Sequence, residues 1–220
     1  MSPPAWHGTD RADGAPADER ALLARLRQGD RAAFAALVGR HGGALLRLAR
    51  TFTRDASTAE ELVQDAWVAA LDGLDGFEGR SSIRTWLLHI VSNKARTRLA
   101  REGRTVSLSA FTASSGGDDP AVDPGQFDDR GAWKAPPGLW TEENPERLAQ
   151  GAQTRAALER AIAALPEAQR AVLTLRDVEG LEAEEICGIL AITVGNQRVL
   201  LHRARARVRE ALEQALSGPR

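Results

Sequence analysis

Apolar residues recur every three to four positions along two stretches of this chain, and this period constrains the fold more than any other feature. The stretches cover residues 18–104 and 154–216, and no apolar period persists over 105–153 between them. A spacing of about 3.6 residues is typical of helices that bury one face, whereas strands alternate every second residue. No strand pattern occurs, so the sequence predicts an all-α protein: two small helical domains joined by a long flexible linker.

The first stretch predicts a bundle of four helices with short connections. Asp18 and Asp30 are expected to cap the first two helices, because a short acidic side chain accepts hydrogen bonds from the free N–H groups of a first turn. Gly29 is expected to end the first helix. Gly42 and Gly43 interrupt the second helix and weaken the prediction of one continuous rod.

The third and fourth helices have clearer starting signals. Ser57 and Glu60 have the spacing of a capping box, and the fourth helix is expected over residues 82–101. Trp67 and Trp86 lie on the apolar faces of these helices and are expected in the core.

The third helix carries two contrasting faces. One is a continuous apolar stripe, and the other is polar apart from one valine, which suits contact with a partner. The stripe consists of Leu62, Val63, Ala66, Trp67, Ala70, Leu71 and Leu74. The opposite face consists of Glu61, Gln64, Asp65 and Val68.

The glycine-rich loop over residues 76–82 has the composition of a segment that wraps an unstacked base through backbone and side-chain hydrogen bonds. The helix after it ends in a basic segment, where Lys94, Arg98 and Arg101 share one face. Loop and segment together predict contact with nucleic acid, although a solvated helix end is an equally good interpretation of the segment taken alone.

The second stretch ends in a helix-turn-helix pattern: a short helix over about 182–190, a turn at 191–193 and a long basic helix from 194 to 216. Such a long helix places its N-terminal half in a DNA major groove. The inner corner of this motif is expected to consist of Ile186, Leu190, Ile192 and Val194.

The tail and the linker have no helical pattern. Residues 1–17 are polar and are expected to be disordered. Residues 105–150 hold eight acidic and three basic side chains, a net charge of −5, together with four of the ten aromatic residues. Two interpretations of these aromatics stay open: they pack onto the helical domains, or they dock into a channel of a partner.

Composition excludes several classes of protein. The single cysteine, Cys187, permits no internal disulfide and is expected to be a buried, inert thiol. No run of about 18 apolar residues predicts a membrane helix, and the N-terminus lacks a signal peptide, so the chain is expected in the cytoplasm. No metal-ligand spacing, cofactor motif or catalytic constellation is recognisable, so no enzyme activity, cofactor or metal is expected.

Four motifs together resemble the extracytoplasmic-function (ECF) sigma factors of the bacterial sigma-70 family. The resemblance covers about residues 18–104 and 154–214. The motifs are Glu61-Leu-Val-Gln-Asp65, Gly76-Phe-Glu-Gly-Arg-Ser-Ser-Ile-Arg-Thr-Trp-Leu87, Leu165-Pro-Glu-Ala-Gln-Arg170 and Ala204-Arg-Ala-Arg-Val208.

The resemblance implies a role for each domain. Residues 18–104 would be sigma domain 2, and 154–216 would be sigma domain 4, in a factor that directs core RNA polymerase to promoter DNA and aids its opening. The implied contacts with the β′ clamp helices of the polymerase are Glu61, Gln64, Asp65 and Val68. The implied contacts with the −10 element are Phe77, Glu78, Gly79, Arg80, Ser81, Ser82, Arg84, Lys94, Arg98 and Arg101. The implied contacts with the −35 element are Asn196, Arg198, Val199, His202 and Arg203.

The resemblance also implies further partners. The polymerase β subunit would hold part of the factor, the acidic linker would thread toward the active centre, and an anti-sigma factor is a common inhibitor in the family. Nothing in the sequence identifies such an inhibitor.

The helix-turn-helix departs from the family pattern at several positions. Glu182 replaces the usual serine or threonine cap of the short helix. Gln197 stands where the family has an apolar residue and is expected to be half-buried. Val199 and Leu200 stand where the family has a small polar residue and then a base, and Leu200 cannot neutralise a phosphate. These changes bear on the −35 sequence preference more than on duplex binding.

Two rival functions compete with this interpretation. A helix-turn-helix regulator that binds operators without polymerase explains the second stretch but leaves the polar face of the third helix unused. An enzyme is the second rival, and no group of residues in the sequence supports it.

Overall fold

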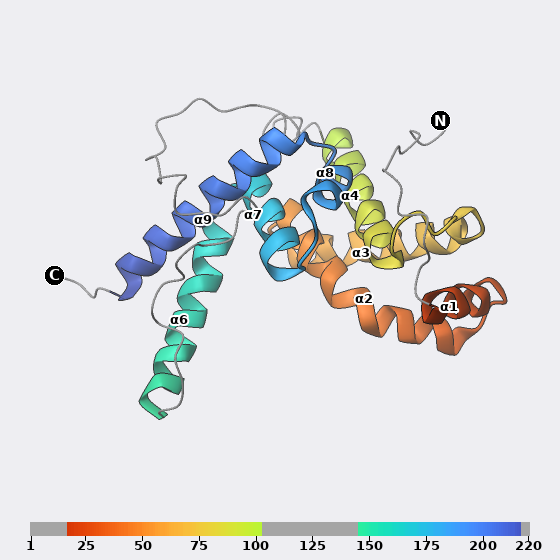
Figure 1. Cartoon of the computed structure of the whole chain (residues 1–220), viewed down its shortest axis with the longest axis horizontal. Helices are drawn as coiled ribbons and strands as arrows, with labels where there is room; N and C mark the ends of the chain where they lie inside the picture. Colours follow the sequence, from red (N-terminus) through yellow and green to blue (C-terminus); the bar gives the residue numbers. More distant parts are fainter. Residues whose placement is uncertain (1–16, 103–144, 217–220) are drawn as a thin grey trace. The chain divides into compact units, whose positions relative to one another are not determined.

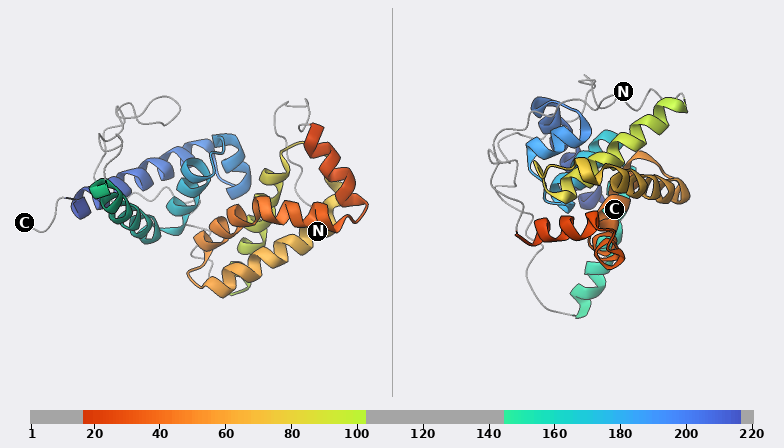
Figure 2. Two further views of the ribbon diagram at one scale, coloured as in Figure 1. Left: turned by 90° about the horizontal axis from the view of Figure 1, so that it is seen from below. Right: turned by 90° about the vertical axis from the view of Figure 1, so that its right-hand side faces the viewer.

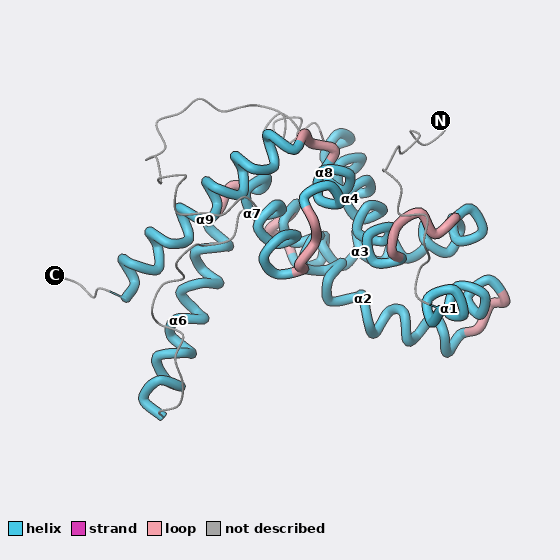
Figure 3. Tube along the Cα trace, viewed as in Figure 1, coloured by secondary structure: helices cyan, strands magenta, loops and turns pink. Residues whose placement is uncertain are grey.

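The computed structural model describes residues 17–102 and 145–216. The chain divides into two compact units, Met1–Gly103 and Arg104–Arg220. Every regular element in the described ranges is helical, as Figure 3 shows, which confirms the prediction of an all-α fold. The predicted disordered tail and most of the predicted linker, with its aromatic residues, lie outside the described residues.

The first unit is built from α1 (Ala17–Arg27), α2 (Arg31–Phe52), α3 (Ala56–Gly73), a 3-10 turn (Leu74–Gly76) and α4 (Ile83–Arg101). Helices α2, α3 and α4 pack against one another, and α1 lies against α2 and the 3-10 turn (Figure 1; Figure 2). The core side chains that are almost fully buried are Leu45, Leu48, Leu87, Leu88 and Val91. Each such side chain stabilises the bundle by about 1.5–3 kcal/mol.

The connection between α1 and α2 follows the sequence closely. Gly29 has a φ of +75°, which a residue with a Cβ adopts only at a cost, and its N–H donates to Leu26 O at 2.9 Å. Asp30 then caps α2, since its Oδ1 accepts from the N–H groups of Ala32 and Ala33. Helix α1 begins at Ala17, so Asp18 is a helical residue and was wrongly predicted as the cap.

Two further expectations for this unit are wrong. Helix α2 continues through Gly42 and Gly43, because its many buried side chains offset a cost of about 1 kcal/mol per glycine. Helix α3 is capped by Asp55 rather than by a box of Ser57 and Glu60. The Oδ2 atom of Asp55 accepts from Thr58 N at 2.7 Å, Thr58 Oγ1 at 2.6 Å and Ser57 Oγ at 2.7 Å.

The second unit consists of α6 (Pro145–Ala164), α7 (Glu167–Leu173), a π-helical turn (Thr174–Val178), α8 (Ala183–Leu190) and α9 (Val194–Leu216). Helix α6 begins nine residues before Thr154, where the apolar period starts. Proline is favoured in a first helical turn, where its missing N–H costs nothing, so Pro145 is compatible with this early start.

The helix-turn-helix is confirmed in the second unit. Val172, Leu175, Ile186 and Ile189 are almost fully buried beneath α9 and its neighbours. Helix α8 ends at Leu190; the next residue, Ala191, has a left-handed φ of 54°, and Ile192 N donates to Cys187 O at 3.1 Å. This reversal aims α9 away from α8, as the motif requires. None of the helices within 17–102 and 145–216 has the length and hydrophobicity needed to cross a membrane.

Candidate functional site

The outer face of α3 is exposed along its whole length. Glu61, Gln64, Asp65 and Val68 all lie on it, and Val68 is 59% exposed although it is apolar. The opposite side of the helix is held in the core by Ala59, Leu62, Ala66 and Ala70. The bundle therefore fixes the helix while its polar face stays exposed to solvent.

Leu71 was wrongly predicted in the core stripe. It is 49% exposed, because it follows Leu62 by nine residues, about two and a half helical turns, and so points the other way. It lies three residues after Val68 and adds a second apolar side chain to the outer face.

The two core tryptophans are half-buried rather than fully buried. Trp67 meets the ring of Phe34 edge to face, with centroids 5.7 Å apart, and so joins α3 to α2. Trp86 stacks on Phe77 at 4.7 Å and joins α4 to the loop before it.

The loop over residues 77–82 begins at a buried residue, has an exposed tip and ends at an exposed residue. Phe77 is only 7% exposed, because its ring packs on Trp86, so this aromatic side chain lies in the core rather than on the predicted base-accepting surface. Glu78 and Arg80 are exposed and pair at 2.8 Å across Gly79, whose φ of +73° favours glycine. Ser82 caps α4, since its Oγ accepts from Thr85 N at 3.0 Å.

Two side chains of α1 contact this loop, and nothing in the sequence indicated them. Arg27 Nη2 donates to Phe77 O at 2.7 Å and to Leu74 O at 3.3 Å. Glu19 Oε1 accepts from Ile83 N at 2.5 Å. No local pattern connects residues so far apart in the chain, so no sequence signal could have found these bonds.

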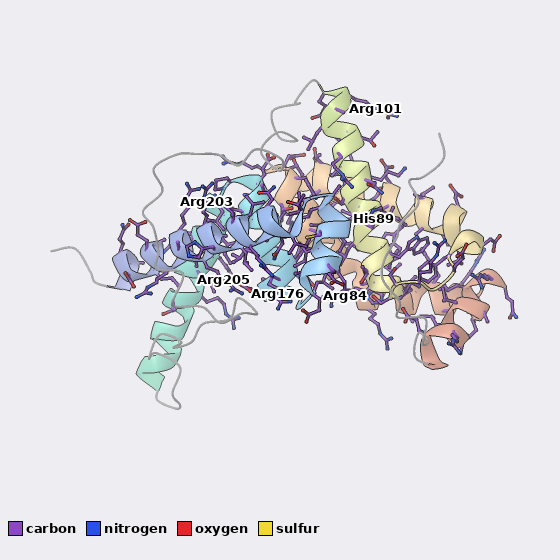
Figure 4. The ribbon with its side chains drawn as sticks, turned by 45° about the horizontal axis from the view of Figure 1, so that its top comes forward. Arg84, His89, Arg101, Arg176, Arg203 and Arg205 are labelled. Atoms are coloured by element: carbon purple, nitrogen blue, oxygen red, sulfur yellow. The ribbon has the colours of Figure 1, made fainter. Side chains whose placement is uncertain are left out.

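Helix α4 presents its basic residues in different settings. Figure 4 shows Arg84 and Arg101 along α4, and Arg101 is exposed while Arg84 and Lys94 are half-buried. Arg98 is engaged by two acids: its Nη1 lies 2.8 Å from Glu61 Oε2, and its Nε lies 3.0 Å from Glu102 Oε1. The surface predicted for DNA thus touches the surface predicted for polymerase.

A hydrogen-bonded row on α4 was also missed at the sequence level. The Nδ2 atom of Asn93 lies 3.0 Å from His89 Nδ1. The Oδ1 atom of Asn93 accepts a hydrogen bond from Arg96 Nη2 at 2.5 Å. Burial lowers the pKa of His89, and the positive charge of Arg96 lowers it further. The spacing of four and three residues was visible in the sequence, but three polar residues in a helix carry no specific signal.

The residues at the start of α9 differ in how far their side chains are exposed to solvent. Arg198 and Val199 are exposed, and Asn196, His202 and Arg203 are half-buried. Gln197 is only 2% exposed and Leu200 is also buried, so these two departures from the family pattern belong to the core. Burial of Gln197 goes beyond the half-buried position expected, and burial of Leu200 explains why an apolar residue is accepted there.

The later cations of α9 hold the second unit together. Arg205 donates two hydrogen bonds, of 2.6 and 3.0 Å, to the carboxylate of Asp177. Arg207 Nη1 donates to Gln169 Oε1 at 3.1 Å. Figure 4 shows Arg203 and Arg205 projecting from α9. Positive charge available to DNA is therefore concentrated before residue 204, in the N-terminal half of the helix.

The turn before α8 is fixed without a serine or threonine cap. Glu185 Oε2 accepts from Glu182 N at 3.0 Å, and Arg176 Nη1 bonds both Leu181 O and Glu182 Oε2. Val194 is exposed, so the prediction that it lines the inner corner is wrong: it starts α9 on the solvent side.

Cys187 is half-buried rather than buried. Burial raises the pKa of its thiol, and the neighbouring carboxylate of Glu184 raises it further, which favours the unreactive protonated form.

The sequence matches two family models, Sigma-70 region 2 over residues 37–105 and Sigma-70, region 4 over residues 155–208. The RNA polymerase sigma-H factor of Pseudomonas aeruginosa is 32% identical over 198 residues, which cover 90% of this chain and 95% of that protein. The ECF RNA polymerase sigma-E factor of Escherichia coli K12 is 33% identical over 187 residues, 85% of this chain and 90% of that protein.

Two solved structures are also similar. The structure of CnrH in complex with the cytosolic domain of CnrY aligns with a TM-score of 0.52 at 26% identity, covering 89% of this chain and 97% of that one. The sigma factor RpoE, in complex with the anti-sigma factor NepR from Bartonella quintana, aligns with a TM-score of 0.52 at 22% identity, covering 85% and 98%, and supports the fold alone.

The matches to regions 2 and 4, together with the open α3 face and the helix-turn-helix, define a sigma factor, which is a transcription initiation factor. More narrowly, the chain belongs to the ECF sigma factors of the sigma-70 family. It directs RNA polymerase to promoters, and the alternative of an operator-binding regulator is not favoured, because that alternative does not account for the match to region 2.

Proposed function

We propose that three exposed surfaces of the chain make three different contacts during transcription initiation. The face of α3 with Glu61, Gln64, Asp65 and Val68 docks on the β′ clamp helices of core polymerase. The loop over 77–82 and the basic side of α4 capture the unpaired −10 strand, and the start of α9 contacts the −35 duplex. The observation that carries this proposal is the open α3 face on a helix whose other side is fully used by the core.

The −10 surface suits an unpaired base followed by a phosphate backbone. The exposed tip offers the backbone N–H groups around Gly79 and the side chains of Glu78 and Arg80 to a flipped base. Arg84, Lys94 and Arg101 on α4 supply positive charge for phosphates. A captured base offsets part of the cost of strand separation, so the promoters that open most readily are those whose −10 bases the tip accepts.

The −35 surface suits the major groove of a duplex. Exposed Arg198 has the planar group that makes two hydrogen bonds to guanine, and exposed Val199 offers an apolar contact to a thymine methyl. Asn196, His202 and Arg203 flank these positions on α9 and reach phosphates or base edges at the rim of the groove. Since Gln197 and Leu200 face inward, they take no direct part in base contact.

Run-off transcription tests the proposal directly. Core polymerase is supplied with templates randomised over the two promoter elements, with this chain, without it, and with the chain alone as a control. We expect transcripts only when both proteins are present, from templates enriched in one −35 and one −10 sequence. If adding the chain to core polymerase increases transcription from none of the templates, the proposal is contradicted.

An inhibitor protein is a second proposed partner. CnrH was solved with the cytosolic domain of CnrY, and RpoE with the anti-sigma factor NepR. We propose that an anti-sigma factor also binds this chain and competes with core polymerase for it. The test is displacement of labelled core polymerase by a candidate inhibitor, and binding of both at once contradicts the competition.

A further inference from the structure

Helix α1 holds both ends of the proposed base-accepting loop. At the start of the loop, one guanidinium nitrogen of Arg27 donates to the carbonyls of Leu74 and Phe77. At its end, the carboxylate of Glu19 accepts from the N–H of Ile83, the first residue of α4. Figures 1 and 2 show α1 beside the 3-10 turn that leads into the loop.

Two of these three bonds satisfy backbone groups that the secondary structure leaves open. Leu74 O already accepts from Phe77 N at 3.2 Å in the 3-10 turn, so Arg27 is its second donor, whereas Phe77 O lies just after the turn and beyond its internal bonds. The N–H of Ile83 is among those that no turn of α4 can pair, and a carboxylate at a helix N-terminus is favoured by the helix dipole. Both contacts join a charged side chain to a peptide group, the stronger class of hydrogen bond.

The loop between the two contacts is held only at its ends. Phe77 is fixed by its burial against Trp86, and Ser82 is fixed as the cap of α4. The tip bonds locally, through the Glu78–Arg80 pair and a weak bond of 3.4 Å from Ser81 Oγ to Ser82 O. Its shape therefore depends on where its two ends are placed.

We infer that α1 is a brace that sets the shape of this loop for base capture, with Arg27 and Glu19 as positioning residues. The inference rests on the proposed role of the loop at the −10 element. Helix α1 precedes residue 37, where the match to Sigma-70 region 2 begins, so the brace is supplied from outside the matched region. Neither residue touches the base: they act through the backbone at residues 74, 77 and 83.

The physical gain is preorganisation. A loop that is ordered before it meets DNA loses less conformational freedom on capturing a base, so more of the contact energy is left for strand opening. Without the brace, the tip samples more shapes, and binding of the unpaired strand weakens while docking of α3 on polymerase is unchanged.

The test compares full-length variants of α1. Arg27→Met keeps the unbranched apolar stem of the side chain and removes its donors, and Arg27→Lys restores one cationic donor group. Arg20→Met is the matched control, because Arg20 is an exposed arginine of the same helix that takes no part in these bonds. Glu19→Leu tests the other end of the loop.

Three quantities are measured for each variant: affinity for core polymerase, binding by the holoenzyme of forked promoter DNA with a randomised single-stranded −10 segment, and amide hydrogen exchange of residues 78–81 in the free chain. We expect Arg27→Met to leave polymerase affinity unchanged, to weaken binding of the preferred −10 strands by about ten-fold and to speed exchange at the tip. Arg27→Lys should lie in between, and Arg20→Met should match the wild type.

If Arg27→Met shows the amide exchange and the strand binding of the wild type, α1 is not a brace. The same holds if amide exchange at the tip is faster but strand binding is unchanged. An equal loss in Arg20→Met also overturns the brace, because the effect is then one of general charge. If Arg27→Met does not fold, Arg27→Lys and Glu19→Leu decide in the same way. A wild-type holoenzyme without any −10 preference refutes the proposed role of the loop, whereas the exchange data refute or support the brace itself.

Discussion

The guanidinium of Arg98 on α4 lies 2.8 Å from the carboxylate of Glu61 on α3. This pair joins two surfaces with different proposed partners, since Glu61 belongs to the polymerase face and Arg98 to the DNA face. Glu61 raises the pKa of Arg98 most strongly, and Glu102 adds to the effect. Both side chains are partly exposed, so the pair adds little net stability, and its importance lies in which partner each group can reach.

Arg98→Met is therefore expected to affect both surfaces in opposite directions. Loss of the cation weakens binding of promoter DNA by the holoenzyme, while the released carboxylate of Glu61 strengthens binding of core polymerase by about two- to three-fold. Titrations with labelled core polymerase and labelled promoter DNA measure the two effects. Arg101→Met serves as the control, because it removes a charge from α4 without releasing Glu61, and a similar gain in polymerase affinity there contradicts the coupling.

Asp65→Arg is expected to weaken binding of core polymerase by about ten-fold or more while the bundle stays folded. Asp65 is exposed in the middle of the α3 face, so reversal of its charge changes the docking surface and leaves the core intact. Binding is measured by titration with core polymerase, and folding is measured by thermal melts.

Glu60→Arg is the matched control for this variant. It makes the same reversal of charge at an exposed position of α3 that lies about a quarter turn from the centre of the face, at its edge. Equal losses in both variants would show that binding depends on net charge rather than on this face.

The sequence predicts what is decided locally. Gly29 and Asp30 each act within four residues of themselves, and their roles as helix signals agree with the structure. The limits of α8 and α9 follow in the same way from the apolar period and the turn at 191–193.

The sequence-based predictions fail where the structure depends on residues far apart in the chain, or where several nearby residues could serve as the same helix signal. Asp55 displaces the box at Ser57, because it collects two hydroxyls as well as a backbone N–H. Phe77 is drawn from the predicted site into the core by Trp86. The bond between Arg27 and Phe77 spans 50 residues, and no period or motif in one sequence encodes such a contact.

Asp55 makes the stability of the first unit sensitive to acid. Hydrogen bonds from the hydroxyls of Ser57 and Thr58, then from backbone N–H groups, lower its pKa from 3.8 to about 2. A carboxyl with a lowered folded-state pKa stabilises the fold fully above its unfolded value, and this contribution is lost as the pH falls through the folded value. Wild-type stability should therefore drop between about pH 4 and pH 2 more steeply than that of Asp55→Asn, which keeps a capping oxygen but does not titrate.

Urea unfolding at a series of pH values, followed by circular dichroism, measures this difference. The two proteins should differ most near neutral pH and converge near pH 2. Parallel curves across the whole range would show that Asp55 is not the group that responds.

Arg198→Ala is expected to weaken promoters that depend on the −35 element and to spare binding of core polymerase. Arg198 is exposed at the start of α9, where a recognition helix meets base edges, so its loss removes a contact made only with the duplex. If Arg198 contacts a guanine, the loss is about 1–3 kcal/mol and preference at one base pair relaxes. If it contacts a phosphate, all sequences weaken alike and the salt dependence of binding falls by about one charge.

Selection of active promoters at two salt concentrations separates these two modes of contact. Arg209→Ala is the control, because Arg209 lies near the other end of α9 and pairs with Glu213 at 2.6 Å, and it should leave both promoter choice and salt dependence unchanged. An equal loss of polymerase binding and promoter use in Arg198→Ala would remove this residue from the −35 surface, since a groove contact is made only after the holoenzyme has formed.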